Sequence, residues 1–133
     1  MDTKTELKTI LVIDDESDVR TYLGRLFQES GYSCAFACDG VEAMQRTRVV
    51  HPHLITLDMS MSNKSGVKFY RELKADPELR AIPVVVVTGV TGQGGSDDTR
   101  RFLETRKQVP PPDAFVPKPV NRAELLDIVA ALI

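Results

Sequence analysis

Short, continuous apolar runs are the feature of this sequence that most constrains how the chain can fold. Residues 9–13 are Thr-Ile-Leu-Val-Ile, and four consecutive valines follow Pro83. A strand that is apolar on both faces belongs inside a sheet that is covered on both sides. The sequence therefore predicts a buried sheet with strands at 9–13, 33–37, 53–57, 82–88 and 114–116.

Helix-forming segments separate these predicted strands. We expect Ser17 to cap the first helix and Gly31 to end it. Its apolar stripe consists of Val19, Tyr22, Leu23, Leu26 and Phe27. Capping boxes at 39–42 and 121–124 predict two further helices that begin there. Another helix is expected to begin near Gly66, and one more to cover the polar stretch 97–108.

Strands and helices thus alternate along the chain. Such alternation predicts a parallel sheet with right-handed crossovers and helices on both faces. We assign residues 1–133 to a single domain, with a polar lead-in at 1–7 and an enlarged segment, rich in glycine and proline, at 89–112.

Composition and charge argue against several classes of protein. The net charge of −2 gives no electrostatic reason to expect nucleic-acid binding, which favours a basic face. No apolar run approaches the ~20 residues that span a membrane, and the polar N-terminus is unlike a secretory signal. We expect Cys34 and Cys38 to be small apolar fillers in or beside a strand, and His51 and His53 to have no chemical role.

Chemically active side chains stand where four of the predicted strands end, namely Asp14, Asp15, Asp58, Thr88 and Lys118. In an open parallel sheet, ligands bind outside the carboxyl ends of the strands. Three carboxylates at one edge repel one another unless a cation neutralises them, and oxygen ligands favour Mg²⁺. With the Lys118 amine and the Thr88 hydroxyl, such a site can hold a phosphoryl group on Asp58 as the in-line nucleophile.

In the type and order of these residues, the sequence resembles a response-regulator receiver domain of two-component signalling, the CheY-like family. The acidic pair, Asp58, Thr88 and the Lys118-Pro119 dipeptide match the family's pattern, and Gly66 falls where the family places a glycine. The resemblance covers nearly the whole chain. It implies a flavodoxin-like (βα)5, doubly wound α/β fold whose five-stranded parallel sheet has the order 2-1-3-4-5.

The resemblance also implies the roles of the site residues. Asp58 would accept a phosphoryl group from a phosphohistidine, in a Mg²⁺-dependent reaction that Lys118 assists. The Mg²⁺ would be held by Asp15, Asp58 and the backbone carbonyl of Ser60, with Asp14 acting through water.

A conformational switch is implied as well. Thr88 and Phe115 would move together when Asp58 is phosphorylated, and the Lys118–Pro119 peptide bond would be cis. The domain would catalyse only its own phosphorylation and dephosphorylation.

The implied partners are a sensor histidine kinase or phosphotransfer protein, and a downstream protein or an effector domain missing from this chain. A homodimer is a further possibility that the family offers. No direct contact with nucleic acid or a membrane is expected, and the expected location is the bacterial cytoplasm.

Four departures from the family pattern lead to further expectations. Ser62 stands where the family usually has proline, and Phe115 replaces the more common tyrosine. Ser60 and Val90 occupy the positions that tune hydrolysis of the acyl phosphate, and both are uncharged, so we expect slow autodephosphorylation. The segment 89–112 is longer than usual, so we expect an altered fourth helix.

Three other functions remain open. A flavodoxin-like cofactor binder would need a phosphate-binding loop where the chain instead has Asp14-Asp15-Glu16. A Mg²⁺-dependent phosphohydrolase would need a second acid just after the nucleophile, where Met59 and Ser60 stand. A receiver-like interaction module that is never phosphorylated would use the same fold without the chemistry.

Overall fold

The computed structural model describes residues 7–59, 65–89 and 110–133. The helix predicted over 97–108 lies outside these ranges, and so do the loop residues Ser60 and Ser62 and residue Val90.

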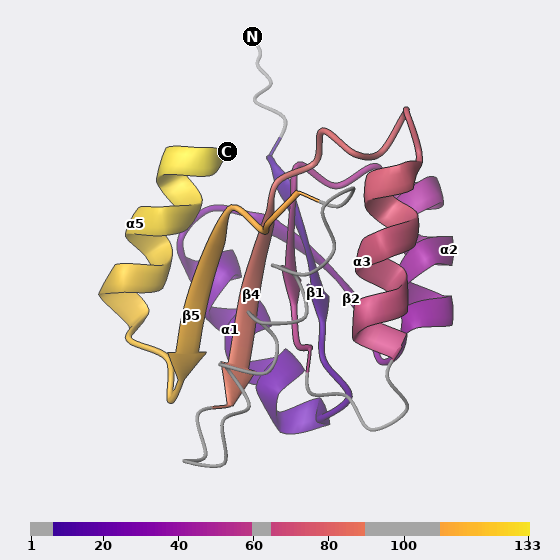
Figure 1. Ribbon diagram of the computed structural model, residues 1–133. Helices are drawn as coiled ribbons and strands as arrows, with labels where there is room; N and C mark the ends of the chain where they lie inside the picture. The colour runs from indigo at the N-terminus through magenta and orange to yellow at the C-terminus, as the bar shows by residue number, and fades with distance from the viewer. Residues whose placement is uncertain (1–6, 60–64, 90–109) are drawn as a thin grey trace, which may run out of the picture.

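Five parallel strands form one sheet in the predicted order, β2-β1-β3-β4-β5 (Figure 1). The strands are β1 (Thr9–Ile13), β2 (Ser33–Ala37), β3 (Leu54–Leu57), β4 (Val84–Gly89) and β5 (Ala114–Lys118). Because the strands are parallel, their carboxyl ends share one edge of the sheet, at the bottom of Figure 1. This order places β1 next to β3, so the side chains after these two strands are neighbours.

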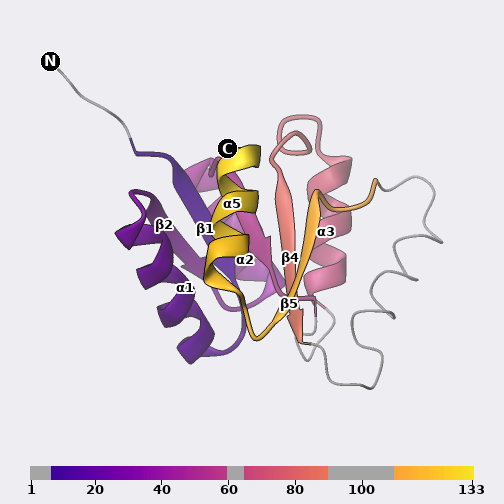
Figure 2. The same ribbon diagram turned by 90° about the vertical axis from the view of Figure 1, so that its left-hand side faces the viewer.

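Helices cover both faces of the sheet, as predicted (Figures 1 and 2). In the described ranges they are α1 (Ser17–Glu29), α2 (Gly40–Val50), α3 (Ser65–Ala75) and α5 (Arg122–Leu132). α1 and α5 lie on one face, and α2 and α3 lie on the other. None of the helices in these ranges has the length and apolarity that a membrane crossing requires.

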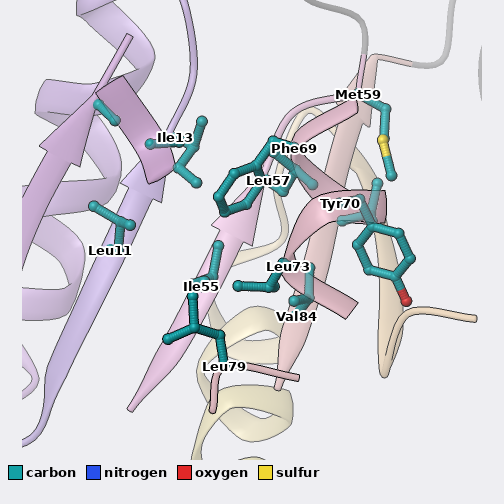
Figure 3. Packing of buried hydrophobic residues seen from close by; sticks show 13 residues of the cluster. Leu11, Ile13, Ile55, Leu57, Met59, Phe69, Tyr70, Leu73, Leu79 and Val84 are labelled. Carbon is teal, nitrogen blue, oxygen red and sulfur yellow. The ribbon is translucent and has the colours of Figure 1, made fainter. Parts of the chain in front are cut away.

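The sheet divides the apolar interior into two clusters because successive side chains of a strand point to opposite faces. Leu11, Ile55 and Val86 belong to the cluster under α2 and α3, whereas Val12 and Val85 belong to the cluster under α1 and α5. Figure 3 shows the first cluster, in which the side chains of α3 pack over those of β3 and β4. The continuous apolar strands of the sequence are thus explained by burial on both faces.

The helix starts depend on individual side chains. Asp39 Oδ1 accepts a hydrogen bond from the Glu42 amide at 2.8 Å, so the predicted cap is present, although the Glu42 carboxylate reaches back to the Cys38 amide. Asn121 caps α5 in the same way, at 2.9 Å from the Glu124 amide.

The first helix begins differently from the prediction. Ser17 is its first residue and Glu16 occupies the cap position, without a side-chain hydrogen bond. The chain already turns at Asp14, whose Oδ1 accepts from the Glu16 amide at 2.9 Å, so Ser17 is not needed as a cap. Gly31 follows the helix in a left-handed conformation with φ of 97°, which suits glycine at a helix end.

The predicted ends of the last two strands were also inexact. β4 begins at Val84 because Ile82 still belongs to a turn, in which its amide donates to the Leu79 carbonyl at 3.0 Å. β5 continues beyond the predicted residue 116, and its residue Pro117 is in register with Thr88. A proline is tolerated here because β5 is an edge strand and needs no donor on its outer side.

The two cysteines and the two histidines have mostly structural roles. Cys34 is half-buried in β2, but Cys38 is exposed, so the prediction that both are apolar fillers is wrong for Cys38. His51 ends α2 with φ of 52°. His53 Nδ1 accepts from the Thr9 amide at 3.0 Å, at the edge of the sheet opposite the acidic residues.

Candidate functional site

Two backbone hydrogen bonds extend the sheet by one residue and fix the positions of two acidic residues. The Asp14 amide donates to the Ala37 carbonyl at 3.1 Å, and the Asp58 amide donates to the Ile13 carbonyl at 3.0 Å. Asp14 and Asp58 therefore continue β1 and β3 rather than standing on free loops. Their carboxyl groups are held by the most regular part of the fold.

Asp14 has a partner for each of its polar atoms. Besides its amide, Oδ1 accepts from the Glu16 amide at 2.9 Å, Oδ2 accepts from Lys118 Nζ at 2.9 Å, and its carbonyl accepts from Arg20 Nη1 at 2.7 Å. The residue is only 1% exposed. Burial raises the pKa of Asp14 above the ordinary value and outweighs its hydrogen bonds to the Glu16 amide and Lys118, which lower it.

Lys118 joins the two buried acids. Its Nζ lies 2.9 Å from Asp14 Oδ2 and 3.7 Å from Asp58 Oδ2. Burial disfavours the charged amine, but the hydrogen bond to Asp14 and the charge of Asp58 are stronger, so the pKa of Lys118 is raised. The amine is therefore positively charged at neutral pH.

Asp58 is buried between apolar neighbours. It is 3% exposed, and Leu57 and Met59 on either side of it are 0% and 6% exposed. Met59 belongs to the buried cluster that includes Phe69 and Tyr70 of α3, and Figure 3 shows it on the side of Tyr70. Packing on both sides thus limits the freedom of the Asp58 backbone.

Asp14, Asp15 and Asp58 bring one carboxylate oxygen each to within 4.8 Å of one another. Asp15, unlike the other two acids, is exposed. Hard oxygen donors in such a cluster fit a divalent cation such as Mg²⁺, which commonly uses one or two carboxylates and retains water. Lys118 neutralises only part of the negative charge, so the donor set remains suited to a cation.

The remaining predicted site residues are Thr88, Ser60 and Phe115. Thr88 is in register with Pro117 near the end of β4, but its side chain lies outside the described part of the chain, as does all of Ser60. Phe115 is half-buried and packs against the cluster under α2 and α3. The Lys118–Pro119 peptide bond is cis, which confirms that prediction.

A small apolar groove of about 290 Å³ opens beside this site. It lies between α1 and the chain after β5, and Tyr22, Lys118 and Pro119 are among the residues that line it. Tyr22 is 45% exposed because its side chain lines this groove, although the sequence placed it on the buried stripe of α1.

Two contacts in the structure were not predicted from the sequence, one at this site and one away from it. Arg20 reaches from α1 to the Asp14 carbonyl, and no residue type in the sequence marks that backbone oxygen as its partner. The buried Tyr70 hydroxyl donates to the Pro110 carbonyl at 2.6 Å and so ties α3 to the chain before β5. No spacing rule in the sequence predicts that second contact.

Comparison with known families gives one match that covers most of the chain. The family described as the response regulator receiver domain matches residues 10–130.

Individual relatives agree with this match. PhoB, the phosphate regulon transcriptional regulatory protein of Escherichia coli, is 30% identical over 125 residues, which are 94% of this chain and 51% of PhoB. DivK, a polar-differentiation response regulator of Brucella ovis, is 32% identical over 94 residues, 71% of this chain and 76% of DivK. The chain therefore spans about half the length of PhoB.

A solved structure supports the fold. The chemotaxis protein CheY4 of Vibrio cholerae has a TM-score of 0.79 to this structure over 96% of this chain and 100% of CheY4. Its sequence identity of 20% makes this a likeness of fold alone.

Proposed function

The chain belongs to the response regulator receiver domain family, and on that basis we propose that Asp58 is its phosphoacceptor. One observation supports the proposal most strongly. Asp58 is a buried carboxylate at a strand end, with the Lys118 amine at 3.7 Å and two further carboxylates within 4.8 Å. An isolated aspartate on a surface loop would have neither the charge partner nor the candidate metal ligands.

In the proposed reaction, a carboxylate oxygen of Asp58 bonds to phosphorus as the N–P bond of a protonated phosphohistidine breaks. The imidazole keeps the electron pair of that bond and leaves as the neutral ring. Lys118 stabilises negative charge on the oxygens of the transferred group. In dephosphorylation, water attacks phosphorus, inorganic phosphate leaves, and the Asp58 carboxylate is restored.

We propose that Asp15 and Asp58, together with the backbone carbonyl of Ser60, hold Mg²⁺, and that Asp14 acts through water. A bound Mg²⁺ supplies positive charge that lowers the repulsion between the incoming phosphoryl oxygens and the acidic cluster. Asp14 is engaged by Lys118 and the Glu16 amide, which favours an indirect role for its carboxylate. The exposed Asp15 is free of such contacts within the described residues.

Signalling would follow from a change at Thr88 and Phe115. Phe115 of β5 pairs with Val86 of β4 and packs against the cluster under α2 and α3, so its movement would alter packing beside α3. We assign residues 1–133 to one signalling domain whose only chemistry is its own phosphorylation and dephosphorylation.

We further propose that the donor is a histidine kinase or a phosphotransfer protein in the bacterial cytoplasm, and that the output is a protein contact, an effector domain or a homodimer. The bacterial sources of PhoB and DivK support this assignment.

The test is incubation of the purified protein with acetyl phosphate and Mg²⁺, followed by intact-mass measurement. The wild type should gain one phosphoryl group, and Asp58→Asn should gain none. Asp18→Asn, which changes an exposed aspartate on α1, is the matched control and should still be phosphorylated. Hydroxylamine should remove the group, because it cleaves an acyl phosphate but not a phosphate ester of serine or threonine.

Two results would count against the proposal: phosphorylation that persists in Asp58→Asn, or a wild type that gains nothing when Mg²⁺ is present. The second result would favour a receiver-like interaction module without chemistry. The decay of the phosphorylated form can be followed in the same samples. The uncharged Ser60 and Val90 lead us to propose slow decay, which loss of the group within seconds would refute.

A further inference from the structure

Arg20 makes a contact that the proposed reaction does not use. This residue lies on α1 and is half-buried, and its Nη1 donates to the backbone carbonyl of Asp14 at 2.7 Å. The backbone amide of Arg20 donates to the Glu16 carbonyl at 3.1 Å. Arg20 therefore contacts the chain between β1 and α1 with both its backbone and its side chain. A hydrogen bond from a charged donor is stronger than one between neutral groups.

The position of that carbonyl gives the contact its consequence. The Asp14 carbonyl belongs to the peptide group that links Asp14 to Asp15. A guanidinium bound to this oxygen restrains the plane of the peptide. That plane, together with the φ angle of Asp15, sets the direction in which the Asp15 side chain leaves the backbone. No hydrogen bond within the described part of the chain holds the Asp15 carboxylate itself, so its direction depends on its backbone.

We propose that Arg20 is a positioning residue for the cation site: by holding the Asp14 carbonyl, it directs the Asp15 carboxylate toward Asp58. This inference rests on the proposed Mg²⁺ site at these residues. Arg20 touches neither the cation nor the phosphoryl group. It acts through the peptide bond between the two acids.

Simple electrostatics predicts the opposite effect for the loss of Arg20. A guanidinium near an acidic cluster repels a cation, so its removal would strengthen Mg²⁺ binding if charge alone mattered. Loss of positioning weakens binding instead, because residues that orient metal ligands typically contribute about tenfold or more to metal affinity. The sign of the change in Mg²⁺ affinity therefore separates the two effects.

The experiment is calorimetric titration with Mg²⁺ of the wild type, Arg20→Met and Arg25→Met. Arg25→Met is the matched control because it removes an equal charge from an exposed position on the same helix. We expect the Mg²⁺ Kd of Arg20→Met to rise about tenfold, and that of Arg25→Met to stay within about twofold of the wild type. Phosphorylation by acetyl phosphate should need more Mg²⁺ in Arg20→Met but reach the wild-type rate once Mg²⁺ saturates.

Unchanged or tighter Mg²⁺ binding by Arg20→Met would overturn the inference. A wild type that binds no Mg²⁺ would instead refute the proposed cation site, so the two failures are distinguishable. Arg20→Lys keeps the charge but loses the planar donor, and it decides the matter if Arg20→Met does not fold. We expect the Mg²⁺ Kd of Arg20→Lys to be at least about threefold higher than that of the wild type. A wild-type Kd in this variant would overturn the inference.

Discussion

Replacement of Lys118 by methionine should destabilise the protein most strongly when no divalent cation is present. The substitution keeps an unbranched side chain but removes the charge that lies 2.9 Å from Asp14 and 3.7 Å from Asp58. Both carboxylates are almost fully buried, so water would replace the lost partner only in part. We therefore expect a loss in the free energy of unfolding.

The magnitude follows from these distances. At an effective dielectric constant of about 20, a unit charge pair is worth about 6 kcal/mol at the shorter distance and about 4 kcal/mol at the longer one. The cost of burying the amine offsets part of this attraction, and the Lys118 side chain is 21% exposed, which screens it further. Because removing one partner of a buried pair typically costs 3–5 kcal/mol, we expect a loss of about 2–4 kcal/mol here.

Dependence on pH provides a second signature. The pKa of Lys118 is raised, so its contribution is complete below the ordinary lysine value and is lost only as the pH rises through the raised one. The wild type therefore keeps this stabilisation at neutral pH. Burial already raises the pKa of Asp14, and loss of the amine would raise it further, so protonation in mild acid should shrink the deficit of the variant.

The assay is urea denaturation followed by circular dichroism, in EDTA and in millimolar Mg²⁺, at neutral pH and in mild acid. Lys68→Met is the matched control because Lys68 is exposed on α3. Bound Mg²⁺ should restore at least half of the stability lost by Lys118→Met, since it supplies positive charge to the same carboxylates. Equal losses in the two variants, or a deficit that Mg²⁺ leaves unchanged, would refute the reasoning.

Three further predictions concern packing, a hydrogen bond and thiol reactivity. Gly24→Ala should lower the free energy of unfolding by about 1–3 kcal/mol, because an added Cβ would lie 2.5 Å from the Phe36 ring. In urea denaturation, the double variant with Phe36→Leu should recover part of this loss. Tyr70→Phe should cost about 1 kcal/mol in the same assay, because it removes only the hydroxyl that donates to the chain before β5, and an unchanged midpoint would contradict this. Burial raises the pKa of the half-buried Cys34 to about 11, and the hydrogen bond with Glu42 raises the pKa of Cys38 as well, so exposure decides which thiol reacts. N-ethylmaleimide at neutral pH should alkylate the exposed Cys38 in the folded protein and both thiols only in urea, as counted by intact mass.

The architecture was predictable because apolar strands and polar strand ends alternate so clearly. The run at 9–13 and the valines of β4 each indicate burial on both faces, and only a sheet between two helical layers satisfies that. Parallel strands then bring Asp14, Asp58 and Lys118 to one edge without any knowledge of distances. Most of the candidate site follows from topology alone.

Details that depend on competing local contacts were not predictable. Serine is a common helix cap, but here the Asp14 carboxylate accepts a hydrogen bond from the Glu16 amide. Ser17 is therefore the first residue of the helix and not its cap. The sequence also gave no means of ranking the partners of Lys118, which lies closer to Asp14 than to Asp58. Arg20 was missed because its contact is with a backbone oxygen, and no residue type marks that oxygen.

The sheet separates two buried clusters, one on each of its faces. Phe115 packs toward α2 and α3, whereas the next residue, Val116, is buried toward α1 and α5. A rearrangement that begins at Phe115 would therefore loosen one layer of the molecule while the other keeps its own interior. A protein bound over α1 and α5 would keep its contact surface when the opposite surface changes, so one small domain carries two faces that can be occupied independently.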